Sequence, residues 1–307
     1  MSDTQRDAQR DAQRDTQHGA TGVSRRPAGS AHRWLAATAA TAALVLSLLT
    51  ATTTSAFTAR LTNTTNTTAS APFFTCTAAD TAVGPAATTF LYRLLESAGT
   101  TATDTSGNNR PGTYTRRGVT YNQPGPCPRD TARAVTLNGT TGYISGPATT
   151  QPAPTTFTVE LWFQTTTTQG GKLIGYGDAF TGNSTSYDRH VYMSNTGQVY
   201  FGVYPNAVKT IITTTTTYND GTWHHVAATL SPTAGMALYL DGQLAATDPT
   251  TTTAQAYSGF WRIGDDNLTG WTNQPTSTFF AGSLAYTAAY TTVLTPTQIR
   301  DHYNAGR

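Results

Sequence analysis

The sequence predicts an all-β fold, in which two antiparallel sheets form a β-sandwich and a short helix ends the chain. Three observations lead to this prediction. Thr is abundant, and its branched Cβ favours strands over helices. Short runs of alternating apolar and polar residues recur between turn-forming residues, which is typical of a sandwich. The one strong helix signal lies at the C-terminus.

Residues 1–56 have the layout of a secretory signal peptide behind a low-complexity extension. Arg residues precede an apolar stretch at residues 34–49, and Thr54-Ser55-Ala56 offers the small side chains needed for cleavage. The stretch is short for a membrane span, which needs about 20 apolar residues, but an uncleaved anchor stays open as an alternative. We expect residues 57–78 to form a Thr/Asn-rich linker and residues 79–307 to form the folded domain.

The positive charge of the chain comes from this leader. The formal net charge is +2, and residues 1–56 carry six Arg and four Asp, which leaves 13 cationic and 13 anionic side chains afterwards. A neutral domain has no basic stripe to attract nucleic acid. We therefore expect no nucleic-acid partner, and membrane contact only through the leader if it stays uncleaved.

The chain has two cysteines, Cys76 and Cys127, both after the expected cleavage site. In an exported protein, two cysteines are most simply interpreted as one disulfide. Two free thiols are the alternative. The leader and the disulfide together predict a secreted, extracellular protein.

The strands follow from the alternating runs. The clearest run is residues 157–163, in which the apolar side chains at alternate positions share one face, while Glu160 and Trp162 share the other. Residues 191–194 and 199–204 flank a turn and predict a hairpin. The remaining runs predict strands over residues 134–144 (two short strands around Asn138-Gly139), 223–230, 237–246, 260–264 and 280–290.

Residues 220–245 give the most specific pattern. Asp220-Gly221 opens the first of three short strands, and Asp241-Gly242 sits between two alternating runs as a hairpin turn. At the C-terminus, Thr295 followed by Pro296 and Gln298 forms a capping-box pattern that predicts a helix.

These blocks, in this order, resemble the laminin-G-like jelly-roll domains of the concanavalin A-like lectin/glucanase superfamily. The resemblance covers roughly residues 88–307: residues 95–108 resemble the opening segment, residues 220–244 match most specifically, and residues 280–299 resemble the closing strand and helix. It implies a two-sheet jelly roll. Because the superfamily hosts lectins, adhesion modules and glycosidases, the fold alone leaves the function open.

The resemblance also implies a calcium site. Many relatives carry an Asp-Glu pair in the closing strand, and an acidic residue there can hold Ca²⁺ together with the opening Asp/Asn loop, but Ala285-Tyr286 stand at that place here. Asp104, Asn108 and Asn109 keep the loop side. Calcium binds about six to eight oxygens, so backbone carbonyls and water would have to complete the shell. The alternative for Asp104 is an Asx turn without metal.

The sequence does not predict an enzyme. A glycosidase needs two carboxyl groups flanking the scissile bond, and the only glutamates are Glu96 and Glu160. Thr158 and Trp162 are the same-face neighbours of Glu160, so its strand carries no acidic pair. An atypical glycoside hydrolase stays as an alternative.

The adjacent histidines His224 and His225 do not predict a zinc site, because consecutive strand residues face opposite ways. We expect each of them to be bonded within the sandwich instead.

Two loop-like segments are the candidate ligand sites. Trp271 lies in one polar segment. Tyr187, Asp188 and Arg189 lie together at the end of the other. An exposed ring beside polar groups can stack on a sugar, and sandwich loops usually carry function. These four residues therefore predict ligand binding, unless the rings only cover the loop ends.

The sequence thus favours an exported, non-catalytic laminin-G-like module that binds a carbohydrate or a cell-surface partner. The alternative is a structural or adhesive surface protein tethered by the uncleaved leader.

Overall fold

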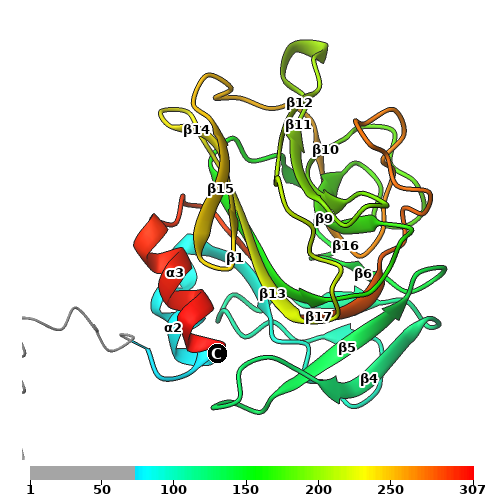
Figure 1. The fold of residues 1–307 in the computed structure, drawn as a ribbon, viewed down its shortest axis with the longest axis vertical. Helices are drawn as coiled ribbons and strands as arrows, with labels where there is room; N and C mark the ends of the chain where they lie inside the picture. The colour runs from blue at the N-terminus through cyan, green and yellow to red at the C-terminus, as the bar shows by residue number, and fades with distance from the viewer. Residues whose placement is uncertain (1–72) are drawn as a thin grey trace, which may run out of the picture. The chain divides into compact units, whose positions relative to one another are not determined.

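Two antiparallel sheets form the framework of residues 73–307, which are the part of the chain that the computed structural model describes (Figure 1). The predicted leader, the possible anchor and most of the linker lie outside these residues. The predicted all-β sandwich with a C-terminal helix is confirmed. No helix within residues 73–307 is long and apolar enough to span a membrane.

The first sheet has eight strands. Seven follow one another in the order β15 (Gln243–Asp248), β14 (Gly235–Leu240), β13 (Trp223–Ser231), β8 (Phe157–Gln164), β17 (Ala281–Tyr290), β5 (Arg133–Asn138) and β4 (Val119–Pro124), and β1 (Thr88–Tyr92) also pairs with β17.

The second sheet has nine strands. Its order is β12 (Thr210–Thr213), β11 (Val199–Val203), β10 (Tyr187–Met193), β9 (Gly171–Gly177), β16 (Ser258–Ile263), β6 (Ile144–Ser145), β3 (Gly112–Tyr114) and β2 (Thr101–Ala102), and β7 (Gln151–Pro152) also pairs with β16. Two short 3-10 turns, η2 (Pro85–Ala87) and η3 (Pro205–Ala207), lie outside the sheets.

The main core lies between the sheets. The alternate apolar side chains of β8 point into it as predicted, and all are fully buried: Phe157, Val159, Leu161 and Phe163. The ring of Phe157 meets that of Phe201 from the second sheet edge to face, with centroids 6.1 Å apart. Because burying one such side chain stabilises by about 1.5–3 kcal/mol, this face fixes the register of β8.

The hairpin predictions are also confirmed. β13, β14 and β15 form consecutive antiparallel pairs, and β10 pairs with β11. Asp241 and Gly242, between β14 and β15, both have positive φ angles of 52° and 73°. These values suit a two-residue hairpin turn, which explains the Asp-Gly sequence there.

Two helices cover the outer face of the first sheet (Figure 1). The predicted helix is α3 (Pro296–Ala305), and it begins with the expected capping box between Thr295 and Gln298. The other, α2 (Cys76–Ala82), starts inside the segment assigned to the linker, with Thr75 as its N-cap. The folded part of the chain therefore includes residues 73–78.

Candidate ligand cavity between the two sheets

A cavity of about 420 Å³ opens at one end of the sandwich. Both sheets contribute to it. Thr89 of β1 and Thr291 after β17 come from the first sheet, and Gly259 to Trp261 of β16 come from the second. Gln151 of β7 and the loop residues Asn109 and Arg110 complete the wall. The size is that of a site for a small ligand.

Aromatic rings form one side of the cavity. Trp261 lies edge to face with Tyr176 at 5.0 Å and with Phe157 at 5.8 Å, so its ring is fixed by the core behind it. Phe260, the neighbour of Trp261 on β16, is half-buried against Phe180. Rings held in this way offer apolar faces and edges at little entropic cost.

Polar residues also line the cavity, among them Asn109, Arg110 and Gln151. The backbone of Arg110 is held at both ends, because its N–H donates to Asp104 Oδ2 at 2.8 Å and its carbonyl accepts from the Tyr92 hydroxyl at 2.9 Å. Its guanidinium makes no hydrogen bond or ion pair within residues 73–307 and is exposed. A fixed backbone thus presents a free charged donor group at the cavity, beside Asn109 and Gln151.

The described side chains that line the cavity include no carboxylate. Two carboxyl groups are what glycoside hydrolysis ordinarily requires. The arrangement can stack on a ligand ring and donate hydrogen bonds to it.

Asp188 and Arg189, predicted as ligand-binding residues, lie inside the protein and are fully buried, so the expectation that they face a ligand is wrong. They form an ion pair with each other. Arg189 also donates to the carbonyls of Pro154 and Gln255, at 2.7 Å and 2.8 Å. Since Pro154 lines the cavity, the pair supports the cavity wall from behind.

Trp271 is also buried, with 3% exposure, so it is not the exposed ring that the sequence suggested. It packs on the outer face of the second sheet, with its ring 4.2 Å from that of His190. Tyr187 is half-buried in the same cluster and donates to the Thr269 carbonyl at 3.0 Å. The four predicted residues therefore do not form one site; the rings cover the loop ends, which was the alternative.

In the predicted calcium loop, the Asp104 carboxylate already accepts hydrogen bonds from backbone N–H groups. Asp104 Oδ1 accepts from the N–H groups of Leu91 (3.0 Å) and Ser106 (2.9 Å), and Oδ2 accepts from Arg110. The bond to Ser106 is the Asx turn. Asn108 donates through Nδ2 to the carbonyls of Pro85 and Thr88. This loop therefore positions Arg110 at the cavity.

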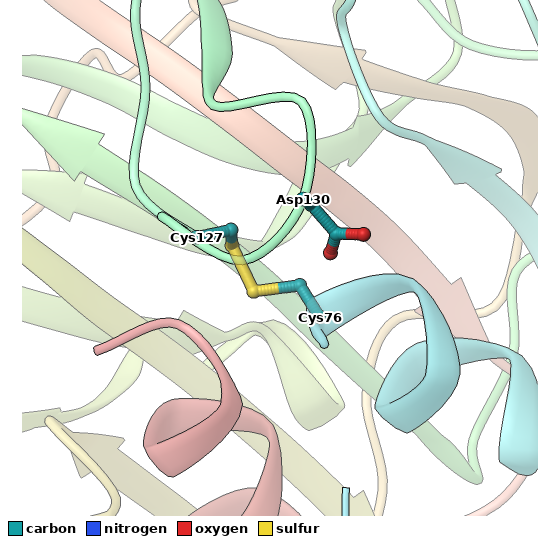
Figure 2. Close-up of side chains that lie close together, drawn as sticks. All are labelled: Cys76, Cys127 and Asp130. Carbon is teal, nitrogen blue, oxygen red and sulfur yellow. A yellow bond between two sulfur atoms is a disulfide. The ribbon is translucent and has the colours of Figure 1, made fainter. Parts of the chain in front are cut away.

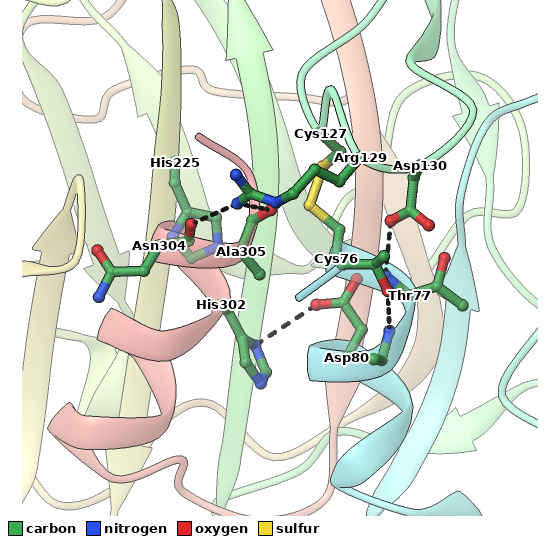
Figure 3. Close-up of a disulfide and its surroundings, with 12 residues drawn as sticks. Cys76, Thr77, Asp80, Cys127, Arg129, Asp130, His225, His302, Asn304 and Ala305 are labelled. Atoms are coloured by element: carbon green, nitrogen blue, oxygen red, sulfur yellow. Dashed lines mark hydrogen bonds and ion pairs between the residues drawn. A yellow bond between two sulfur atoms is a disulfide. The ribbon is translucent and has the colours of Figure 1, made fainter. Parts of the chain in front are cut away.

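The predicted disulfide between Cys76 and Cys127 is confirmed. It joins α2 to the loop before β5, and Asp130 lies beside it (Figure 2). Because both sulfurs are in the disulfide, this group cannot act as a thiolate metal site. Arg129 of the same loop donates to the carbonyls of Asn304 and Ala305 in α3, so this region ties both helices to the sheet (Figure 3).

A buried charge cluster that the sequence did not reveal lies beneath the two helices. Glu160 of β8 accepts from Tyr290 at 2.5 Å and from His302 at 2.9 Å. Asp80 lies 3.6 Å from His302 (Figure 3). His225 Nε2 is 3.4 Å from Glu160, as expected for a histidine bonded within the sandwich. All five side chains are buried, and none of them lines the cavity.

The charges of this cluster balance one another. Burial alone would lower the pKa of His302, but the Glu160 carboxylate raises it to about 9. Burial alone would raise the pKa of Glu160, and His302 and His225 hold it below its usual range. Asp80, Glu160 and His302 bring one possible metal-ligating atom each within 4.8 Å of one another, but Nδ1 of His302 is already bonded to Glu160. The cluster thus connects α2 and α3 to the first sheet.

A family model described as the concanavalin A-like lectin/glucanases superfamily (Laminin_G_3) matches residues 138–300, just over half of the chain. The chain belongs to this superfamily. The match includes β13, β8 and β17 from the centre of the first sheet, β10, β9 and β16 from the centre of the second, and the start of α3.

Solved structures share the jelly-roll architecture of the superfamily. The binding domain of Paraclostridial Mosquitocidal Protein 1 is 15% identical with a TM-score of 0.53, over 72% of this chain and 52% of that one. Trypanosoma rangeli sialidase in complex with sialic acid is 15% identical with a TM-score of 0.50, over 71% and 33%. Domain 4 of AbnA, an extracellular arabinanase from Geobacillus stearothermophilus, in complex with arabinotriose, is 19% identical with a TM-score of 0.48, over 71% and 98%.

The chain thus spans about a third of the sialidase and about half of the mosquitocidal protein domain. At these identities the likeness shows the fold alone. No curated protein sequence matches the chain.

Proposed function

We propose that this chain is an exported, non-catalytic module that binds carbohydrate in the cavity between its two sheets. The observation that carries the proposal is the pairing, at one cavity, of fixed aromatic rings with the unpaired guanidinium of Arg110. Sugars present apolar ring faces and many hydroxyls, so this combination suits them. The superfamily, which is described by its lectins and glucanases, supports the same class of ligand.

The absence of a carboxylate among the described lining residues supports binding without hydrolysis. Glu160, the only glutamate in a sheet-centre strand, accepts hydrogen bonds from Tyr290 and His302 beneath the helices. It is therefore unavailable to a ligand in the cavity. A Glu160→Gln variant that lost a polysaccharide-hydrolysing activity present in the wild type would instead support a glycosidase.

The disulfide supports export, since such bonds persist in oxidising compartments. Cell fractionation tests this: the proposal expects the protein outside the cell, beginning near residue 57, whereas recovery only with membranes would favour a tethered surface protein.

A glycan array combined with a pull-down from cell-wall extract tests the binding. We expect the wild type and Arg117→Ala to retain the same glycans, and Arg110→Ala to lose them. Arg117 is the matched control because it is exposed and lies outside the cavity lining. If the wild type binds no glycan in either assay, the proposal is overturned. If it captures a protein from the extract but binds no glycan, the partner is a surface protein.

A further inference from the structure

Outside the cavity, a lysine and a carboxylate lie together in the interior beneath the outer face of the second sheet. Lys172 of β9 and Asp266, three residues after β16, are both fully buried, and Lys172 Nζ lies 3.5 Å from Asp266 Oδ2. The chain has two lysines, and the other, Lys209, is exposed. Lysine is rarely buried without a partner that satisfies it, so this placement needs an explanation.

Neither of the facing atoms has a hydrogen-bond partner in the described part of the chain. Lys172 Nζ and Asp266 Oδ2 are both buried, and their only polar contact within residues 73–307 is the 3.5 Å approach to each other. The other carboxylate oxygen, Oδ1, accepts from two backbone N–H groups, those of Ser184 at 3.0 Å and Asn267 at 2.8 Å. The carboxyl group is thus held by one oxygen, while its second oxygen faces the amine.

The backbone makes room for this approach. A Cβ at position 175 would come within 3.3 Å of Lys172 Nζ and 2.8 Å of His190 Cβ, and one at position 177 would clash with Asp266 Oδ2 and Ser184 Oγ. Both positions are glycine, in a strand that otherwise pairs regularly with β16. The glycines therefore let two buried polar groups meet with no side chain between them.

We propose that Lys172 and Asp266 form an intramolecular isopeptide bond. The proton of the ammonium group moves to the carboxylate, which gives an amine and a carboxylic acid. The amine nitrogen attacks Cγ of Asp266 and a C–N bond forms. The C–Oδ2 bond then breaks, and Oδ2 leaves as water with the acid proton and one amine proton. Ammonium and carboxylate thus become one amide and one water, with no oxidant or cofactor.

Three features of the site favour this step. The two N–H groups on Oδ1 face the negative charge that this oxygen gains in the tetrahedral intermediate. The fixed approach of the two groups replaces a bimolecular encounter by an intramolecular one. A neutral amide removes two charges from a dry interior, where an ion pair costs desolvation energy.

The surroundings of Lys172 also favour its neutral amine form, which is the reactive one. Burial, together with the buried Arg262, lowers the pKa of Lys172 despite the nearby carboxylates, so the neutral form becomes accessible. Asp265 lies next to Asp266 in the chain and accepts a hydrogen bond from the Thr278 hydroxyl at 2.7 Å. Burial raises the pKa of the Asp265 carboxyl group.

Intact mass spectrometry of the purified wild-type chain under reducing, denaturing conditions tests the proposal. We expect a mass lower than that of the sequence by one water molecule, and a digest that contains one peptide pair joined through Lys172 and Asp266. Lys209→Arg, the matched control, should keep the loss of one water, and Lys172→Met should abolish it.

A wild-type mass equal to that of the reduced sequence overturns the proposal and leaves a buried ion pair. Because this measurement uses the wild type, it decides the question even if Lys172→Met fails to fold. It is also independent of whether the cavity binds carbohydrate.

Discussion

Nδ1 of His302 on α3 lies 2.9 Å from Oε1 of Glu160 on β8, and both side chains are 2% exposed. This buried ion pair connects the C-terminal helix to the centre of the first sheet. Its other partners, Tyr290, Asp80 and His225, come from β17, α2 and β13, so five separate elements meet at one charge cluster. The docking of both helices should therefore depend on the protonation of His302.

The first prediction concerns alkaline pH. The pKa of His302 is raised from 6.5 to about 9 in the folded protein, so its contribution is fully present below pH 6.5 and is lost as pH rises through 9. The shift corresponds to about 3 kcal/mol of unfolding free energy. Urea denaturation at several pH values between 6 and 9.5 measures this loss.

His302→Gln is the control for this prediction. The variant should be less stable at pH 6 and should lose less stability over the same pH range. Some slope should remain, because the pKa of His224 is also raised, by Asp241 and Asp220 against the effect of burial. Equal slopes for variant and wild type would show that His302 does not carry the effect.

The second prediction concerns the disulfide. Cys76 and Cys127 are 51 residues apart, so the bond should contribute about 4 kcal/mol by restricting the unfolded chain. Denaturation of a Cys76→Ala/Cys127→Ala variant should show this loss. Mass spectrometry should show a gain of two hydrogens when the wild type is reduced; an unchanged mass would mean that the thiols are free.

The third prediction concerns calcium. Since three backbone N–H groups already bind the Asp104 carboxylate, we expect the wild-type Tm to be the same in calcium and in chelator. Asp104→Ala should lose about 2–3 kcal/mol in both conditions, because it leaves these donors unpaired. A Tm that rises with calcium only when Asp104 is present would instead establish a calcium site.

The fourth prediction tests whether Trp271 belongs to the core or to the ligand-binding site. Trp271 packs against His190 and over Gly202, where a Cβ would clash with its ring. Trp271→Ala should therefore destabilise the protein by about 3–5 kcal/mol. Glycan affinity of the folded variant should stay unchanged; a selective loss of affinity would return Trp271 to the binding site.

The strands with regular alternation could be predicted from the sequence, and those without it could not. β8 shows period-two alternation and was predicted to within one residue. β9 was missed, because its sequence G-K-L-I-G-Y-G combines three glycines with a buried lysine. Gly175 and Gly177 leave room for the approach of Lys172 to Asp266, which no local pattern reveals.

The candidate site was misplaced for a related reason. Asp188 and Arg189 look exposed in sequence because they are charged, but they lie at a β-bulge where the pairing of β10 with β9 shifts. Arg189 has a φ of 51° there, and both side chains turn inward. The cavity residues Arg110, Gln151 and Trp261 are distant in sequence, and only the closure of the two sheets brings them together.

The measurement that tests the proposed function most directly is the affinity of a glycan selected on the array, determined by isothermal titration. The wild type and Arg117→Ala should bind it equally, and Arg110→Ala should bind at least about tenfold more weakly, since a hydrogen bond from a charged donor contributes about 1.5–3 kcal/mol. Equal affinity of Arg110→Ala and the wild type would contradict carbohydrate binding in this cavity.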